Sequence, residues 1–190
     1  TVEYLLQFAY LGSYYAQKVL GVENPRIGLL NIGAEESKGD TLRRETYQKL
    51  KEAGEAGHLN FTGNIEAKEA IKGGCDVIVT DGFSGNILLK TMEGVGSFAG
   101  SALKSMFKKN LLTKLAALAV MPGLNALKDK LDPNKVGGTA FIGISKAVIK
   151  AHGASNADAV ENAVGQAAAF ARSGLIEKIE ENVNLMKIEQ

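Results

Sequence analysis

This 190-residue sequence has one cysteine, no tryptophan, three prolines and a formal net charge of only +1. The single Cys75 excludes an internal disulfide, and its place at the start of an apolar run predicts a thiol in the core. The balanced charge gives no indication of the positively charged surface that binds nucleic acid. Lys, Pro or Gly interrupts every apolar run within about a dozen residues, so no run is long enough to cross a bilayer. These absences favour a folded protein in a reducing, cytoplasmic setting.

The composition that is present, 45% hydrophobic and 23% charged, is typical of a globular domain with a core. The chain begins at Thr1 without an initiator methionine and enters helical periodicity at once. We therefore expect residues 1–190 to be a single domain or a fragment cut from a longer protein.

Apolar runs and helical patterns alternate along the first half of the chain. Short strands are predicted at 26–32, 59–63 and 76–80, and helices at 5–20, 41–56 and 65–72. Such alternation is typical of a parallel sheet with helices on both faces. The sequence therefore predicts an α/β fold.

The second half is mostly helical. Helices are predicted at 87–107, 156–172 and 175–186, and a glycine cluster at 137–143 is either a loop with a short helix or part of a site. Residues 104–131 combine leucines with lysines, and Pro122-Gly123 is expected to break them into two helices. This segment, 104–131, is predicted to protrude, either as a hairpin packed on a core or as a surface for a membrane or an acidic partner.

Polar and glycine residues follow three predicted strand ends. The end of the first strand and the loop after it carry Asn31, Gly33 and Lys38, and the segment 148–153 contains His152 before a glycine. After the strand at 76–80 come Asp81, Gly82, Phe83, Ser84, Gly85 and Asn86, with Lys90 in the helix beyond. Because the carboxyl ends of parallel strands meet at one edge, Lys38 and Lys90 are expected to face one cavity and hold an anion. Ordinary turn chemistry is the alternative.

The same segments resemble the PlsX family of phosphate acyltransferases over nearly the whole chain. The resemblance is carried by Asn24-Pro25-Arg26-Ile27-Gly28-Leu29-Leu30-Asn31-Ile32-Gly33, Glu35-Glu36-Ser37-Lys38-Gly39, Gly63-Asn64-Ile65-Glu66, Asp81 to Asn86 with Lys90-Thr91-Met92-Glu93-Gly94, Gly137-Gly138 and Ile149-Lys150-Ala151-His152-Gly153. It implies a three-layer α/β/α sandwich, similar to isopropylmalate dehydrogenases and phosphotransacetylases. The chain looks like the C-terminal part of such an enzyme, without the family's N-terminal part, so that the fragment alone is expected to lack part of the site.

The resemblance also implies a reaction. Such enzymes transfer a fatty acyl group from acyl carrier protein to inorganic phosphate, giving an acyl phosphate for phospholipid synthesis. Lys90, His152 and Asn86 are the residues expected to act in catalysis. Those expected to bind phosphate or substrate are Asn31, Gly33, Lys38 and Gly85.

Family members attach peripherally to the bacterial membrane, dock an acidic carrier protein and usually form homodimers. A lysine and leucine face suits either the membrane or the carrier protein. The residues expected to make these contacts are Lys108, Lys109, Leu111, Leu112, Leu115 and Leu118.

No cluster of His, Cys, Asp or Glu has the spacing of a metal site, and no cofactor is expected. An isopropylmalate-type dehydrogenase would need clustered aspartates for a divalent metal, and none are seen. Two alternatives stay open: a phosphate acyltransferase that uses coenzyme A, and a membrane-docking or dimerising module with no chemistry of its own.

Overall fold

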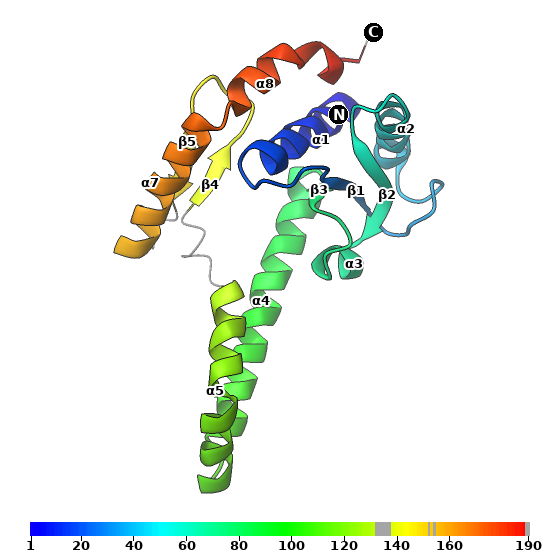
Figure 1. Cartoon of the computed structure of the whole chain (residues 1–190). Helices are drawn as coiled ribbons and strands as arrows, with labels where there is room; N and C mark the ends of the chain where they lie inside the picture. The colour runs from blue at the N-terminus through cyan, green and yellow to red at the C-terminus, as the bar shows by residue number, and fades with distance from the viewer. Residues whose placement is uncertain (132–137, 152, 154, 189–190) are drawn as a thin grey trace. The chain divides into compact units, whose positions relative to one another are not determined.

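The computed structural model describes residues 1–131, 138–151, 153 and 155–188 (Figure 1). The chain is an α/β protein that forms two compact units. The first unit contains residues 1–81, 139–150 and 164–190, and the second contains 82–138 and 151–163.

A three-stranded parallel sheet lies at the centre of the first unit (Figure 1). Its strands, in the order β2-β1-β3, are β2 (Asn60–Glu66), β1 (Arg26–Asn31) and β3 (Val77–Val79). The predicted strands at 26–32 and 76–80 are confirmed to within a residue at each end. Because β1 is central, its carboxyl end lies between those of its neighbours.

One face of this sheet is covered by α1 (Val2–Lys18) and α2 (Thr41–Glu55), which also contact each other. Ile27 and Leu29, alternate residues of β1, are almost fully buried in the core under these helices. The two helices supply Leu5, Leu6, Tyr10, Tyr14 and Leu50 to this core. The helix predicted at 41–56 is confirmed as α2, and Asp40 caps its start, because the Asp40 carboxylate accepts a hydrogen bond from the Arg43 N–H at 2.9 Å.

The opposite face carries a smaller cluster of Ile65, Ala70 and Cys75, formed with α3 (Ala67–Ile71). A Cβ on Gly28 of β1 would lie 2.8 Å from the Ile65 side chain and 3.1 Å from the Cys75 sulfur. Glycine is therefore required for this close packing. Burial raises the pKa of the Cys75 thiol, and the prediction of a core cysteine is confirmed. Helices on both faces give the three-layer α/β/α arrangement.

The prediction that β2 ends at Gly63 and that a helix starts at Ile65 is wrong. The strand continues to Glu66, and α3 begins only at Ala67. Thr62 is skipped in the pairing with β1, since Ile27 pairs with Phe61 and Gly28 with Gly63. Gly63, at φ +98°, accommodates this bulge and does not end the strand.

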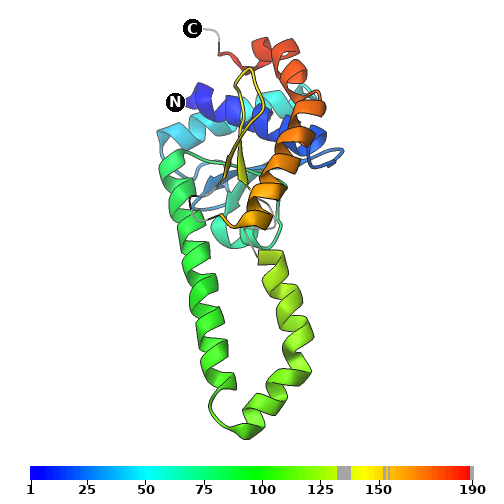
Figure 2. The ribbon, with the colours of Figure 1, turned by 90° about the vertical axis from the view of Figure 1, so that its left-hand side faces the viewer.

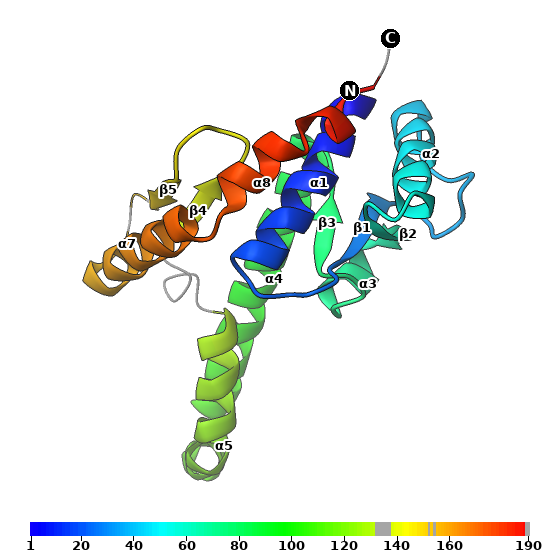
Figure 3. The same ribbon diagram turned by 45° about the horizontal axis from the view of Figure 1, so that its top comes forward.

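The first unit also contains β4 (Gly138–Phe141), β5 (Val148–Ala151), α8 (Leu175–Glu181) and a 3₁₀ turn at Val183–Met186. Figure 3 shows α8 beside α1, and the Lys178 ammonium lies 5.3 Å from the Tyr14 ring centre. The helix predicted at 156–172 is confirmed as α7 (Ala157–Arg172), and the Asn156 side chain before it accepts a hydrogen bond from the Ala159 N–H at 2.9 Å. Within the described residues β5 pairs with β4 alone, so the expectation that 148–153 ends a strand of the main sheet is wrong.

The second unit is dominated by α4 (Gly82–Phe107) and α5 (Leu111–Leu131), joined by a short connection (Figure 2). The helix predicted at 87–107 starts five residues earlier, so Gly82 to Asn86 are helical and not a turn. The predicted break at Pro122 is also wrong, because α5 continues through it. The residues around Pro122 include leucines, alanines and lysines, which have high helix propensity.

Candidate anion site at the carboxyl edge of the sheet

The carboxyl ends of β1 and β3 lie side by side, because the two strands are parallel neighbours with Leu29 opposite Val79. Asn31 and Asp81 each lie two residues beyond that pair. In open α/β sheets this is the edge at which ligands usually bind. The loop that follows β1, residues 32–40, is held at this edge by side-chain hydrogen bonds.

Two buried asparagines hold this loop. Asn31 donates from Nδ2 to the Lys38 carbonyl at 3.0 Å and accepts from the Ile32 N–H at 2.8 Å. Asn64 of β2 donates from Nδ2 to the Glu35 carbonyl at 2.8 Å. Both asparagines are at most 9% exposed. Amides from adjacent strands therefore fix the loop at both its middle and its far end.

Gly33 and Gly39 lie at the two ends of the loop, where the backbone is crowded. A Cβ on Gly33 would lie 2.9 Å from the Lys38 side chain, and one on Gly39 would lie 2.6 Å from the Asn31 Oδ1 atom. Gly39 also has φ +87°, a conformation that L side chains rarely adopt. Gly33 thus packs directly against the stem of Lys38, whose side chain is exposed.

Arg43, in the first turn of α2, joins this loop to the end of β3. Its Nη1 donates to the Asp40 carboxylate at 2.7 Å, and its Nη2 forms an ion pair with Asp81. The Arg43 side chain is only 17% exposed. The backbone N–H of Arg43, followed by its guanidinium charge, holds the pKa of Asp40 below its ordinary value.

Three more residues predicted to act in catalysis or to bind phosphate, Gly85, Asn86 and Lys90, lie on α4. Gly85 is half-buried, and Asn86 and Lys90 are exposed. Asn86 and Lys90 are four residues apart and so share one helix face. The Lys90 ammonium pairs with Glu93 at 2.7 Å. The first turn of α4 contains no acidic side chain.

Of the other predictions, His152 lies outside the described residues. The cluster Lys108, Lys109, Leu111, Leu112, Leu115 and Leu118 is exposed throughout, at the start of α5 and the connection before it. No residue of α4 is buried. Among the helices that the structure describes, none has the length and apolar character needed to span a membrane, and the same residues contain no cluster of metal-binding side chains.

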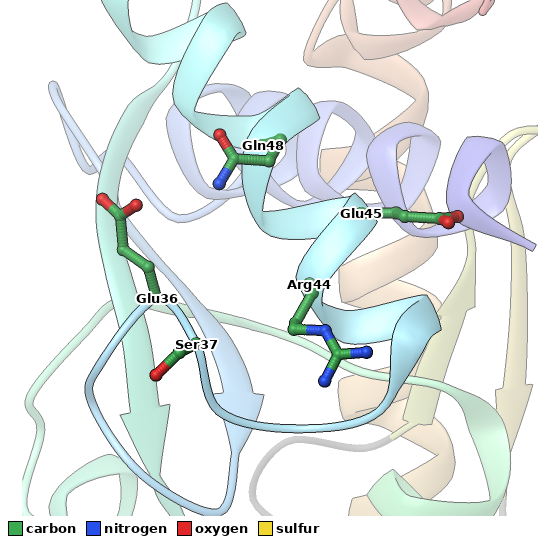
Figure 4. A pocket seen from close by; sticks show the side chains of 5 residues that line it. All are labelled: Glu36, Ser37, Arg44, Glu45 and Gln48. Carbon is green, nitrogen blue, oxygen red and sulfur yellow. The ribbon is translucent and has the colours of Figure 1, made fainter.

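One surface hollow is not at the predicted residues. It has a volume of about 430 Å³ and lies between the loop and α2, lined by Glu36, Ser37, Arg44, Glu45 and Gln48 (Figure 4). None of the residues predicted to bind phosphate or substrate lines this hollow. We therefore place the candidate site at the strand ends and not in this hollow.

Sequence reasoning missed Asn64, Asp40 and Arg43 as part of this edge and gave Asp81 no role. Asp40 was detectable as a helix cap, since it directly precedes a helical pattern. The pairing of Arg43 with Asp81 had no signal, because 38 residues separate them in the chain.

Comparison with known proteins shows the family of the chain. Residues 1–178 match the family model described as "Fatty acid synthesis protein". The chain is 48% identical over 180 residues to a phosphate acyltransferase of Alkaliphilus oremlandii, covering 95% of this chain and 52% of that protein. It is 44% identical over 185 residues to the phosphate acyltransferase of Anoxybacillus flavithermus, covering 97% of this chain and 55% of that protein.

The chain thus spans about half the length of the curated relatives that it matches. The match nevertheless includes the whole parallel sheet and both loops at its carboxyl edge. The chain belongs to the fatty acid synthesis protein family, the PlsX family, whose curated members are named phosphate acyltransferase.

Proposed function

We propose that the natural protein containing this chain transfers a fatty acyl group from acyl carrier protein to inorganic phosphate, producing an acyl phosphate for phospholipid synthesis. The observation that carries the proposal is the loop 32–40, which two buried asparagines and Arg43 fix at the carboxyl edge of a parallel sheet. The names of the relatives supply the reaction class, since a phosphate acyltransferase must bind phosphate.

In this reaction a phosphate oxygen attacks the thioester carbonyl carbon. A C–O bond forms, the C–S bond breaks, and the leaving sulfur takes a proton. Catalysis requires that phosphate be held in line and that the developing oxyanion be stabilised. Lys38 is exposed on the fixed loop, with its stem against Gly33, and is suited to contact phosphate. Asn31 has both amide atoms engaged by the loop, so any contact with substrate would use its remaining hydrogen-bonding capacity.

On α4, we assign Lys90 and Asn86 to phosphate or oxyanion contacts and Gly85 to close backbone approach. Their exposure on one helix face supports this role. His152 is assigned proton transfer to the leaving sulfur, which suits the ordinary pKa of histidine. This assignment rests on the family resemblance alone.

The exposed cluster around α5 is proposed to contact the membrane surface or the acidic carrier protein, and the protein to act as a homodimer. Burying an exposed leucine contributes about 1.5–3 kcal/mol, and a lysine near an anionic lipid surface about 1 kcal/mol. Four leucines and two lysines are therefore sufficient for reversible attachment after ordering costs are subtracted.

The activity is tested by measuring acyl phosphate formed from palmitoyl-acyl carrier protein and inorganic phosphate by the natural protein. Lys38→Ala and Lys90→Ala should each lower kcat/KM for phosphate by about 100-fold, as removal of one transition-state donor does elsewhere. Lys49→Ala is the matched control, because Lys49 forms an exposed pair with Glu52 at 2.8 Å that resembles Lys90 with Glu93. A well-folded protein with no turnover would refute the proposal.

The same assay separates the acyl donors. Turnover with palmitoyl-coenzyme A that exceeds turnover with the carrier-protein thioester would favour the coenzyme A alternative.

Surface attachment is tested by flotation with phosphatidylglycerol vesicles. Leu112→Gln and Leu115→Gln should reduce vesicle binding, whereas Leu20→Gln, at a leucine 62% exposed outside this cluster, should not. Turnover in detergent should be unchanged in all three. If vesicle binding is the only activity found, the chain is a docking module instead.

A further inference from the structure

We infer that Arg43 is a positioning residue for phosphate binding, which acts by holding the loop 32–40 to the end of β3 through Asp40 and Asp81. The inference rests on the proposed function, since it concerns the same edge of the sheet. Nothing in the sequence pattern or in the names of the relatives assigns Arg43 a role.

The geometry makes Arg43 a link between two separate chain segments. Asp40 ends the loop that follows β1, and Asp81 follows β3, two residues beyond Val79. The guanidinium group contacts both carboxylates, at 2.7 Å to Asp40 and in a direct ion pair with Asp81. Its planar fork suits two acceptors at once, which the single ammonium of a lysine would not match.

The surroundings show that this link is built into the edge. The Arg43 side chain is 17% exposed and that of Asp81 is 29% exposed, so water screens the pair only partly. The Arg43 Cβ lies 2.9 Å from the position of a Cβ on Gly39, so the helix start packs tightly on the end of the loop. Gly39 in turn lies against Asn31. Displacement of Arg43 would therefore be transmitted directly to the residues that hold Lys38.

The electrostatic consequence concerns the bound anion. Asp40 and Asp81 are two carboxylates at an edge proposed to bind phosphate, and both would repel it. Arg43 offsets their charge and also fixes their position. Loss of Arg43 should therefore weaken phosphate binding much more than binding of the acyl donor.

The test compares Arg43→Gln and Arg43→Lys with Lys49→Ala, a control on the exposed side of the same helix, in the natural protein. Arg43→Gln is expected to raise the KM for phosphate by at least about 10-fold and to lower kcat/KM for phosphate by about 100-fold, the cost of a misplacement near 1 Å. The KM for palmitoyl-acyl carrier protein should change less than 2-fold. Arg43→Lys should retain part of the kcat/KM that Arg43→Gln loses, because lysine keeps the positive charge but not the planar guanidinium group.

A second variant covers the case in which Arg43→Gln fails to fold. Asp81→Asn removes the other partner of the link with a side chain of the same shape, and should also lower kcat/KM for phosphate, because release of the loop outweighs the loss of one repelling carboxylate. When Arg43→Gln and Asp81→Asn are combined, the decrease in kcat/KM for phosphate should be smaller than the product of the two single decreases, since each substitution breaks the same link. Melting curves of every variant separate loss of fold from loss of binding.

The outcomes are distinct. Wild-type protein without turnover refutes the proposed function itself. Wild-type turnover with an unchanged phosphate KM in folded Arg43→Gln or Asp81→Asn overturns the role of Arg43 and leaves the proposed function standing. A lower melting temperature with unchanged kinetic constants would show that the link is only structural, and would likewise overturn the inference.

Discussion

The two ends of the β1–β3 strand pair are each closed by an arginine, but in different ways. At the amino end, Arg26 donates to Asp76 from Nε and Nη2 at 3.0 Å and to the carbonyls of Gly73 and Gly74. At the carboxyl end, Arg43 joins Asp40 to Asp81. The Arg26 side chain is 46% exposed, whereas that of Arg43 is 17% exposed.

The difference lies in what each arginine supports. Arg26 ties a strand start to the short turn that precedes β3, and the bonds that the structure shows for it all end on that turn. Arg43 lies next to a nine-residue loop that also requires Asn31, Asn64 and two crowded glycines. A loop that only joined a strand to a helix would not require this many fixed contacts. We therefore propose that the amino edge serves stability and the carboxyl edge serves binding.

The largest effect is expected from Gly39→Ala. The new Cβ would lie 2.6 Å from the Asn31 Oδ1 atom in a backbone conformation of φ +87°. A non-glycine residue in this region costs about 1–3 kcal/mol, and relief of the clash would displace the loop. We expect loss of at least about 100-fold in kcat/KM for phosphate. Gly57→Ala, at φ +75° with no neighbour within 4 Å, is the matched control and should affect stability alone. Full activity in Gly39→Ala would contradict the importance of the loop.

A core variant between the two edges should act on stability only. Gly28→Ala places a methyl group 2.8 Å from the Ile65 side chain and should destabilise the fold by about 1–3 kcal/mol through overpacking. Urea denaturation measures this loss. The KM for phosphate in the folded protein should not change, and a changed KM would mean that any disturbance of β1 reaches the edge.

Arg26→Gln should have a smaller effect than either variant. It removes an exposed ion pair and two bonds to carbonyls, so the melting temperature should fall by only a few degrees. Kinetic constants should match those of the wild type. An increase in the phosphate KM comparable with that of Arg43→Gln would abolish the proposed distinction between the edges.

The smallest effect concerns pH. Hydrogen bonds from the Arg26 side chain and backbone lower the pKa of Asp76 from 3.8 to about 2. The unfolded chain then binds more protons than the folded one, so Asp76 contributes stability above its ordinary pKa and loses it as the pH falls to about 2. The stability difference between the wild type and Asp76→Asn should therefore shrink over this interval in acid denaturation. A difference independent of pH would contradict the ion pair.

Much of the first unit could be predicted from local patterns. The apolar run of β1 and the Asp40 cap before α2 are short-range signals, and both elements lie where the pattern placed them. Glycine and proline caused the errors. Gly63 lies in a bulge within β2, Gly82 begins α4, and Pro122 lies inside α5. A glycine or proline can end a helix or strand or lie within it, and the surrounding structure decides which.

The candidate site was only partly predictable for the same reason. Asn31 ends β1, and Gly33 and Lys38 follow it directly, so the pattern identified this strand end and its loop. Asn64, Arg43 and Asp81 come to that loop from other elements, and their contacts depend on the pairing of β1 with β2 and β3. No periodicity in a single sequence records such pairing.

The most direct test of a phosphate site at the carboxyl edge is hydrogen–deuterium exchange of the natural protein with and without inorganic phosphate. The account predicts slower exchange in the loop 32–40 and at residues 80–81 when phosphate is present, with no change around Gly73 to Asp76 at the amino edge. Protection that is absent from the loop, or that is found instead at the amino edge, would contradict it.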